Sequence, residues 1–281
     1  MVEKMKKKLS ICCIARNEGL YLREWLKFHL GIGVTSIFLY DNDSCDNTKE
    51  ICSEFQGKVR VIDWKTVEGK SPQLTAYNHF IENFSKDFEF ALCIDLDEFL
   101  VFEDGHDLSD FLKSVPNNIG AIGINQRVFG SNGLLDYDDL PVTGRFLKCN
   151  LIQNNENLFF KSIFRPHCVV NFVSSHALAL KNDYFYSDSF FDLENFDNVS
   201  SGQSKVARFG RVRINHYILK SKAEFMIKRE RGGVAATTAV ERLSRYENEY
   251  WFFTKRDEQS NLVEDRRADD IYTDIIKKYT Q

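Results

Sequence analysis

Residues 88–99 read Phe-Glu-Phe-Ala-Leu-Cys-Ile-Asp-Leu-Asp-Glu-Phe, and this stretch decides the fold. Its apolar first part, Phe88 to Ile94, has the length and composition of a buried strand. That strand places Asp95, Asp97 and Glu98 at its carboxyl end. Residues two apart in extended or turning backbone can point to one side, so the two aspartates are expected to face the same space.

Paired carboxylates repel each other, and this repulsion raises the pKa of one of them unless a cation lies nearby. Oxygen ligands suit Mg²⁺ or Mn²⁺, which keep coordination positions free for phosphate oxygens. The pair therefore predicts a divalent metal site at Asp95 and Asp97. A solvated surface turn is the alternative, because Asp-x-Asp is also common in turns.

Upstream of this stretch, strands alternate with helices. Strands are predicted over 9–15, 36–40 and 59–64, and helices over 21–30, 46–55 and 71–84. Such alternation predicts βαβ units around a parallel sheet, and ligands of open α/β sheets bind at the carboxyl ends of the strands. One edge of the sheet is therefore expected to hold the polar residues that follow the strands, namely Arg16, Asn17, Glu18, Asp41, Asn42, Asp43, Asp95 and Asp97.

The pattern is weaker after residue 99. A short helix is predicted over 107–115, strands over 119–124 and 209–218, mostly helix over 222–255, and a final helix near 271–279. The fold class is α/β, with an open sheet flanked by helices and with helices at the C-terminal end. His29 lies on the apolar face of the first predicted helix and is expected in the core.

Composition excludes some classes of protein. The 281 residues carry a formal net charge of −4, with 43% hydrophobic residues and 24 Phe, which is typical of a globular protein without a general attraction to nucleic acid. Positive charge gathers between residues 205 and 231 and could receive an anionic ligand or form a solvated face. The seven Cys include no Cys-x-x-Cys, and we find no signal peptide or membrane span, so a cytoplasmic protein with reduced thiols is expected.

Two histidines are candidate functional residues. His216, in Asn215-His216-Tyr217, could be a third protein ligand of the metal, and Lys or Arg side chains after it could neutralise a leaving diphosphate. His176, which follows Val173-Ser-Ser, is a candidate general base. A purely structural role is the more ordinary alternative for either histidine.

An ordered set of short motifs resembles the GT-A glycosyltransferases, in particular glycosyltransferase family 92 and related bacterial enzymes of the family 2 type. The set runs from about residue 11 to residue 232. The matching pieces are Ala15-Arg-Asn-Glu18 with Glu24-Trp-Leu26 and Phe28-His29, Tyr40-Asp-Asn-Asp-Ser44 with Asp46 and Thr48, Gln73 with Ala76-Tyr77, Ile94-Asp-Leu-Asp-Glu-Phe-Leu100, Phe129-Gly-Ser131, Lys161-Ser-Ile163 with Arg165-Pro166, and Asn215-His-Tyr217 with Lys220-Ser221.

The resemblance implies a GT-A-like, Rossmann-like open mixed sheet in a catalytic domain over residues 1–232. Its nucleotide-binding half would cover about 9–100 and its acceptor half about 101–232, followed by a helical extension over 233–281. The resemblance also implies a nucleotide-sugar donor, with uridine diphosphate as the expected carrier, and Mn²⁺ or Mg²⁺ as cofactor.

The roles of single residues follow by the same resemblance. Asp95 and Asp97 correspond to the Asp-x-Asp of such enzymes, and His216 to the C-terminal metal ligand. The donor-binding residues would be Ala15, Arg16, Asn17 and Glu18 under the nucleotide, Asp41, Asn42 and Asp43 near base and ribose, Gln73 beside the donor, and Lys220, Ser221 and Arg231 at the diphosphate.

Related enzymes invert the anomeric centre, which requires a base at the acceptor hydroxyl. His176 is our first choice, with Asp136, Asp188 and Glu98 as alternatives. The acceptor would be a glycan or a lipid-linked glycan, and the basic stretch or the aromatic run 250–253 could give peripheral contact with a membrane, although core packing explains that run as well. A nucleotidyltransferase and a non-catalytic carbohydrate-binding relative are the rival functions.

Overall fold

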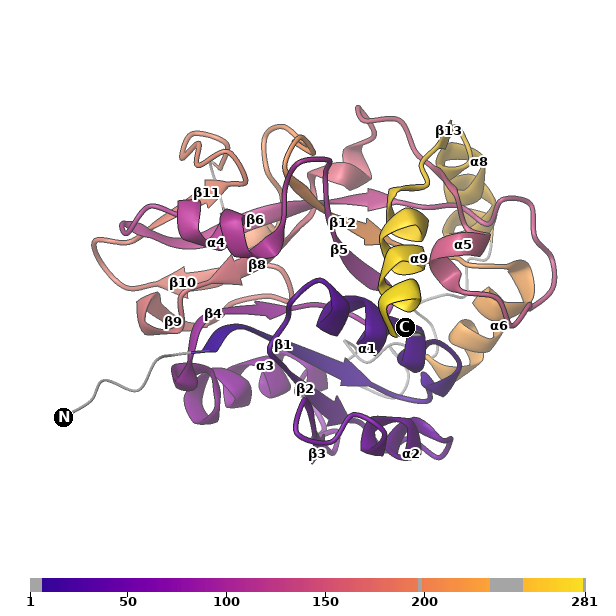
Figure 1. Cartoon of the computed structure of the whole chain (residues 1–281), viewed down its shortest axis with the longest axis horizontal. Coiled ribbons are helices and arrows are strands. Elements are labelled where there is room, and N and C mark those ends of the chain that lie inside the picture. Colours follow the sequence, from indigo (N-terminus) through magenta and orange to yellow (C-terminus); the bar gives the residue numbers. More distant parts are fainter. Residues whose placement is uncertain (1–6, 197–198, 233–249, 280–281) are drawn as a thin grey trace.

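A curved mixed sheet of nine strands forms the centre of the molecule (Figure 1). The computed structural model describes residues 7–196, 199–232 and 250–279. Eight strands of the sheet follow one another in the order β3-β2-β1-β4-β8-β6-β12-β5, and β11 pairs with β6 beside this path. The predicted α/β class, with an open mixed sheet and C-terminal helices, is confirmed.

The first four strands are parallel, as their alternation with helices predicts. They are β1 (Lys7–Ala15), β2 (Ser36–Asp41), β3 (Val59–Asp63) and β4 (Phe88–Cys93). Successive side chains of β1 enter opposite cores, with Ile11 on one side and Cys12 on the other, because side chains alternate across a strand. A strand that is buried on both faces reads as a continuous apolar run, which is why the sequence pattern found it.

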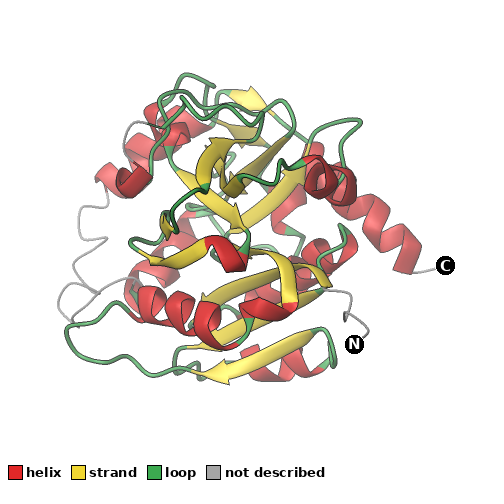
Figure 2. Ribbon diagram, turned by 90° about the vertical axis from the view of Figure 1, so that its left-hand side faces the viewer, coloured by secondary structure: helices red, strands yellow, loops and turns green. Residues whose placement is uncertain are grey.

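Helices cover both faces of this half (Figure 2). The helices α1 (Gly19–Gly31) and α2 (Thr48–Ser53) share one core with the face that includes Ile11. The helix α3 (Pro72–Asn83) shares the other core, and the Ser71 hydroxyl caps its N-terminus by accepting from Leu74 N–H. The carboxyl ends of β1, β2 and β4 therefore remain between the helices.

The second half of the sheet is mixed. It contains β5 (Glu98–Phe102), β6 (Ile119–Val128), β8 (Phe160–Phe164), β11 (Phe185–Asp188) and β12 (Val212–His216). Strand β8 is antiparallel to β4 and β6, whereas β12 is parallel to β6 and antiparallel to β5. Outside the large sheet lie the pairs β9 (Val169–Phe172) with β10 (Leu178–Leu180) and β7 (Lys148–Cys149) with β13 (Val263–Glu264), and the short helices α4 (Leu108–Ser114) and α5 (Val142–Arg145).

Helix α1 is fastened to β5, the strand that begins at Glu98. The Trp25 indole N–H donates to the Glu98 carbonyl at 2.8 Å. The His29 imidazole bonds the Trp25 carbonyl through Nδ1 at 2.9 Å and accepts the Leu100 N–H through Nε2 at 3.2 Å. His29 is fully buried, so its predicted core position is confirmed.

The C-terminal elements pack back onto the first half of the chain. They are α6 (Lys222–Arg231), a π-helical turn at Tyr250–Lys255, α8 (Arg256–Ser260) and α9 (Arg267–Tyr279). Helix α9 lies against α1 (Figure 1), and Tyr272 joins the same core as Trp25. The predicted boundary at residues 232 and 233 falls at the start of residues 233–249, which lie outside the described residues, so the domain division stays a prediction.

The remaining helix predictions have mixed outcomes. The predicted helix over 222–255 is present at both of its ends, and its middle lies outside the described part of the chain. Within the aromatic run, Phe253 is buried and packs against Phe225 at 5.2 Å between ring centroids, as core packing predicts. No described helix is both long enough and apolar enough to cross a lipid bilayer.

Candidate active site

The turn between β4 and β5 carries the acidic residues. The Glu98 N–H donates to the Asp95 carbonyl at 3.1 Å, and the Asp95 N–H donates to the Glu98 Oε2 at 3.0 Å. Leu96 is 3% exposed and faces the core between the two aspartates. The Asp-Leu-Asp-Glu order thus closes a tight turn and leaves the two aspartate side chains for other partners.

Asp95 has partners from two other elements. Its Oδ2 accepts from the Lys161 ammonium of β8 at 3.0 Å, and its Oδ1 accepts from the Gln73 amide of α3 at 2.5 Å and from the Tyr77 hydroxyl at 3.3 Å. Lys161 also lies 3.4 Å from Glu98 Oε2. The predicted residues Gln73 and Asp95 are therefore in contact, and the buried Lys161 neutralises part of the negative charge of the turn.

Asp97 faces His216 and helix α6. Strand β12 pairs with β5 so that His216 lies opposite Glu98, and the Tyr217 N–H donates to the Asp97 carbonyl at 2.8 Å. The His216 Nε2 is 3.6 Å from Asp97 Oδ1, and the Lys228 ammonium is 2.6 Å from Asp97 Oδ2. The structure thus brings the predicted pair Asp97 and His216 together.

Burial and ion pairing shift these carboxyl groups in different directions. Burial alone would raise the pKa of both aspartates, but the Lys161 ammonium opposes it at Asp95 and the Lys228 ammonium is the largest opposing influence at Asp97, so both pKa values are lowered. Burial dominates at Glu98 and raises its pKa to about 7. Two ionised aspartates beside a less acidic glutamate are a suitable surrounding for a cation.

The loop after β1 is cross-linked to the loop after β2. The Asn17 N–H donates to the Ser44 hydroxyl at 3.0 Å, and the Asn17 Oδ1 accepts from the Cys45 N–H at 2.8 Å. Asn17 and Asp43 both have left-handed backbone, with φ of 52° and 57°, which Asn and Asp tolerate better than most residues. Arg16 is partly buried in the same loop.

Glu18 ties this loop to helix α6. Its Oε1 pairs with Arg231 at 2.6 Å, and Arg231 also donates to the Asn17 carbonyl at 3.1 Å. Asn17, Glu18 and Arg231, three predicted donor-binding residues that are far apart in sequence, are therefore in contact.

Other predicted donor-binding residues form hydrogen bonds and ion pairs within the protein at the ends of β1 and β2. The Ala15 carbonyl accepts from the Asn42 N–H at 2.8 Å, and the buried Asn42 amide donates to the Trp64 carbonyl at 2.8 Å. Asp41 is 2% exposed and pairs with Lys49 at 3.4 Å. Asp43, by contrast, is exposed. Of the acidic pair predicted near base and ribose, only Asp43 presents its carboxylate to solvent.

Lys220 and Ser221 stand where β12 leads into α6. Ser221 is fully buried and forms a capping box with Glu224, in which its hydroxyl accepts the Glu224 N–H at the start of α6. Lys220 is 4% exposed, has left-handed backbone with φ of 58°, and lies 4.2 Å from the ring centroid of Tyr21. Burial lowers the pKa of Lys220, and within the described ranges we find no hydrogen bond or ion pair of its ammonium.

The base candidate His176 has one ring nitrogen, Nε2, for which we find no hydrogen-bond partner among the described residues. Its Nδ1 bonds the Phe160 carbonyl at 2.9 Å, so Nδ1 carries the proton and Nε2 can accept one. Burial and Lys161 lower its pKa to about 4, which keeps the imidazole neutral near pH 7.

The alternative bases are placed less suitably. Asp188 is fully buried and accepts from Phe190 N–H, Asp192 N–H and the Asn195 amide. Glu98 is 1% exposed inside β5. Neither can meet an acceptor hydroxyl from solvent, whereas Asp136 lies on an exposed loop.

The donor set at Asp97 and His216 fits a divalent cation chemically, since a carboxylate oxygen and an imidazole nitrogen are ordinary ligands of Mn²⁺. Among the described residues, no three His, Cys, Asp or Glu side chains are grouped closely enough to hold a metal by themselves. Any ion there would therefore need further ligands from Asp95 after a side-chain movement, from water or from a bound phosphate.

The sequence does not mark three residues that contact the predicted site. Lys161 lies within a matching motif and Lys228 within the basic stretch, but neither pattern assigns them to the site, and Gln126 lies in no motif. Each lies in mid-strand or mid-helix, without a local pattern that marks function. Their contacts with the site span many residues of sequence, 131 in the case of Lys228 and Asp97.

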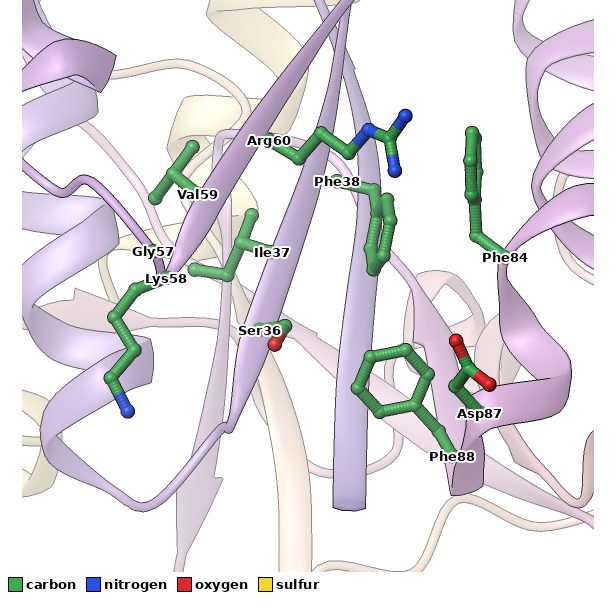
Figure 3. Close-up of a pocket in the computed structure, with 10 residues that line it drawn as sticks. All are labelled: Ser36, Ile37, Phe38, Gly57, Lys58, Val59, Arg60, Phe84, Asp87 and Phe88. Atoms are coloured by element: carbon green, nitrogen blue, oxygen red, sulfur yellow. The ribbon is translucent and has the colours of Figure 1, made fainter. Parts of the chain in front are cut away.

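A separate hollow of about 270 Å³ lies at the other end of the strands (Figure 3). It is lined by the first residues of β2, β3 and β4, among them Ser36, Val59 and Phe88, and the Arg60 guanidinium lies 4.5 Å from the Phe84 ring centroid. Ligands of open α/β sheets usually bind at the carboxyl ends of strands, and this hollow lies at the amino ends of β2, β3 and β4.

Comparison with solved structures gives distant likenesses. TarS from S. aureus aligns with a TM-score of 0.42 and 13% identity, over 88% of this chain and 73% of that chain. Glucosyl-3-phosphoglycerate synthase from Mycobacterium tuberculosis, solved in complex with Mn²⁺ and uridine diphosphate, aligns with a TM-score of 0.34 and 12% identity, over 58% of each chain.

Sequence comparison is more specific. A family 92 protein of Oryza sativa subsp. japonica is 28% identical over 215 residues, which is 74% of this chain and 33% of that protein. One from Ricinus communis is 28% identical over 188 residues, 63% of this chain and 32% of that protein. The chain thus spans about a third of the length of these relatives. The model of glycosyltransferase family 92 matches residues 7–195, and the chain therefore belongs to this family.

Proposed function

We propose that the protein is a metal-dependent glycosyltransferase that moves a sugar from a nucleoside diphosphate to a hydroxyl of a glycan or lipid-linked glycan. The observation that carries the proposal is the grouping of Asp97, His216 and two lysines at the strand ends. The buried Lys220 ammonium is central. Asp97, Glu18 and Glu224 attract it, but within the described residues none of them forms an ion pair with it, so an anionic ligand would stabilise this desolvated cation.

Asp97 and His216 would hold Mn²⁺ or Mg²⁺, with Asp95 as the predicted further ligand. The ion would supply charge stabilisation for the departing diphosphate. The Lys228 ammonium pairs with Asp97 Oδ2 at 2.6 Å, so it would have to leave that oxygen if an ion bound there. Its positive charge would then be available for the negative charge of the donor.

The chain's own cations would bind the leaving group. The charge-assisted bonds of Lys220, Lys228 and Arg231 to phosphate oxygens would be stronger as the bond between sugar and diphosphate breaks, because negative charge then grows on the diphosphate. Gln73 and the loop of Arg16, Asn17, Glu18 and Asp43 would position the donor. Uridine is proposed as the base.

The acceptor hydroxyl oxygen would form the new bond to the anomeric carbon from the face opposite the diphosphate, which inverts that centre. The electron pair of the broken carbon–oxygen bond leaves with the diphosphate, and the hydroxyl proton passes to His176 Nε2. This role is supported by the neutral ring with its Nδ1 engaged at Phe160. An unchanged turnover rate in His176→Ala would exclude it.

The test of the function is Asp97→Asn, which keeps the size of the side chain and removes its charge. We expect kcat to fall about 10²–10³-fold, the usual effect of losing one preorganised electrostatic contact. Turnover is measured as release of nucleoside diphosphate from a panel of sugar nucleotides with Mn²⁺.

The matched control is Asp87→Asn, since Asp87 is exposed at the far hollow. The control should retain wild-type turnover. Wild-type turnover in Asp97→Asn itself would contradict the metal assignment. Release of pyrophosphate would instead favour a nucleotidyltransferase, and the absence of any nucleotide binding would favour a non-catalytic carbohydrate-binding protein.

A further inference from the structure

Gln126 lies in β6, next to the strand that carries His216. The two residues are 90 positions apart in sequence, and the parallel pairing of β6 with β12 brings them together. The Gln126 Oε1 is 3.0 Å from His216 Nδ1. Gln126 is 7% exposed, so this contact is shielded from water.

The orientation of the Gln126 amide is determined by its other end. Its Nε2 donates to the Glu156 carbonyl at 2.9 Å. A carbonyl oxygen can only accept, so the NH₂ group must point to Glu156 and the amide oxygen must point to His216. The reverse orientation would place two acceptors against each other in a buried position.

The position of Glu156 is itself fixed by the C-terminal part of the chain. The Arg256 guanidinium of α8 makes a bidentate pair with the Glu156 carboxylate, with Nε and Nη2 at 2.9 and 2.7 Å from Oε1. The backbone of Glu156 belongs to a 3₁₀ turn over Asn155–Leu158. The acceptor for the Gln126 amide is therefore held in place by contacts outside the site.

An acceptor at His216 Nδ1 selects one tautomer of the ring. Nδ1 must carry the proton in order to donate to Gln126 Oε1, and Nε2 is then left with its lone pair. The Glu98 Oε1 lies 3.9 Å from Nδ1, beyond hydrogen-bond distance, so Gln126 is the described partner of that nitrogen. The lone pair of Nε2 faces Asp97 Oδ1 at 3.6 Å, where a cation would relieve the repulsion between them.

We propose that Gln126 is a positioning residue that fixes the tautomer of His216 and so prepares its Nε2 to bind a divalent cation, an assignment that rests on the function proposed above. Gln126 acts through His216 and does not itself touch the metal or the donor. Such partners of a metal-binding histidine typically contribute 10–100-fold to metal affinity.

The first measurement needs no variant. Long-range ¹H–¹⁵N correlation spectra of the full chain, with ¹⁵N-labelled histidine and at a pH where the rings are neutral, report which nitrogen of each ring carries the proton. His216→Gln identifies the signal of His216 among the six histidines. We expect a protonated Nδ1 and a bare Nε2, and a protonated Nε2 would overturn the proposal.

The second measurement compares variants. Gln126→Met keeps the length of the side chain but cannot accept from Nδ1, and Gln259→Met makes the same change at an exposed position of α8. In Gln126→Met we expect a shift toward the Nε2-protonated ring and Mn²⁺ binding about 10–100-fold weaker by electron paramagnetic resonance. Gln259→Met should match the wild type in both.

The outcomes separate the positioning role from the function on which it rests. An unchanged tautomer together with unchanged Mn²⁺ affinity in Gln126→Met would show that Gln126 has no such role. If the wild type binds no Mn²⁺, the metal assignment is wrong, and the tautomer comparison alone decides whether Gln126 orients His216. If Gln126→Met does not fold, the tautomer of the wild type still decides.

Discussion

Lys220 is 4% exposed, and its ammonium lies 4.2 Å from the centroid of the Tyr21 ring. Side chains of this kind usually have a carboxylate partner when they are buried. The left-handed backbone of Lys220 adds conformational strain. Both features oppose the stability of the free protein, and the unpaired ammonium favours the arrival of an anion.

Lys220→Met is therefore expected to act oppositely on binding and on stability. Affinity for uridine diphosphate with Mn²⁺ should fall by roughly 1.5–3 kcal/mol, the typical contribution of hydrogen bonds to a charged group. The free energy of unfolding should stay equal or rise, since a buried unpaired charge is removed. Calorimetric titration and urea denaturation measure the two effects.

Lys58→Met, at an exposed position, provides the comparison and should change neither quantity. Unchanged nucleotide affinity in Lys220→Met, or a large loss of its stability, would argue for a structural lysine instead.

His29 makes stability depend on pH. Burial removes the ring from water, which disfavours the charged form and lowers its pKa to about 3. Protonation would also place a second N–H against the Leu100 N–H that Nε2 now accepts. Its pKa in the unfolded chain is about 6.5, so acid protonates the unfolded state first and stability falls as pH drops below 6.5. Between pH 7 and pH 5 the loss should be about 2 kcal/mol.

The variant His29→Gln can still donate and accept hydrogen bonds but does not titrate. Urea denaturation of both proteins at the two pH values should show that the variant loses about 2 kcal/mol less than the wild type on acidification. Equal losses in both proteins would show that His29 does not titrate in this way.

Among the secondary-structure elements, the C-terminal segment is joined to the sheet by a buried ion network. Asp265, directly after β13, accepts from Arg213 of β12 at 2.7 Å and from Arg127 of β6 at 3.2 Å. The side chains of Arg213 and Asp265 are 3% and 11% exposed. Arg213 also pairs with Glu103, directly after β5, so this network joins β6 and β12 to the end of β5.

Asp265→Asn removes one partner and leaves two buried guanidinium groups incompletely paired. We expect the free energy of unfolding to fall by about 3–5 kcal/mol, the usual effect of breaking a buried pair. Glu264→Gln is the matched control, because the Glu264 side chain is 63% exposed and an exposed pair contributes little. A loss below about 1 kcal/mol in Asp265→Asn would mean that solvent screens the network.

The elements also show what the sequence could predict. Strands β1 to β4 and the helices between them were found because an apolar strand and an amphipathic helix each have a characteristic period. Strand β5 was missed because it begins at Glu98, directly after the aspartates, without a separate turn signal. Its partner is β12, more than a hundred residues later, and pairing over that distance leaves no local pattern.

For the molecule as a whole, local sequence patterns predict one part of the candidate site, and long-range strand pairing determines the rest. Asp95, Asp97 and the loop after β1 follow strands that the sequence identifies, so their common edge could be predicted. Lys161 and Gln126 come from the antiparallel and mixed half, where side-chain neighbours depend on strand order. Their contacts required the three-dimensional arrangement of the sheet.

Binding of the donor nucleotide should stabilise the whole molecule. At 100 times its dissociation constant, a ligand that binds only the folded state adds about 2.7 kcal/mol. For a domain of this size that corresponds to a rise in Tm of roughly 5–10 °C. Differential scanning calorimetry with Mn²⁺ and uridine diphosphate measures it.

Uridine with Mn²⁺ is the matched ligand control, because it lacks the diphosphate and should give little shift. A rise of the same size with uridine alone would show that the diphosphate cations contribute nothing to binding.

The pairing of β12 with β5 places His216 opposite Glu98 and thereby sets the spacing between His216 and Asp97. Side chains alternate between the two faces of a strand, so displacement by a single position would turn the imidazole away from the carboxylate. Insertions or deletions inside either strand should therefore be far less tolerated than point substitutions, whereas the exposed turns beyond them can vary in length. Directed evolution of this protein should consequently recover sequence diversity in both strands but almost no variants of altered strand length.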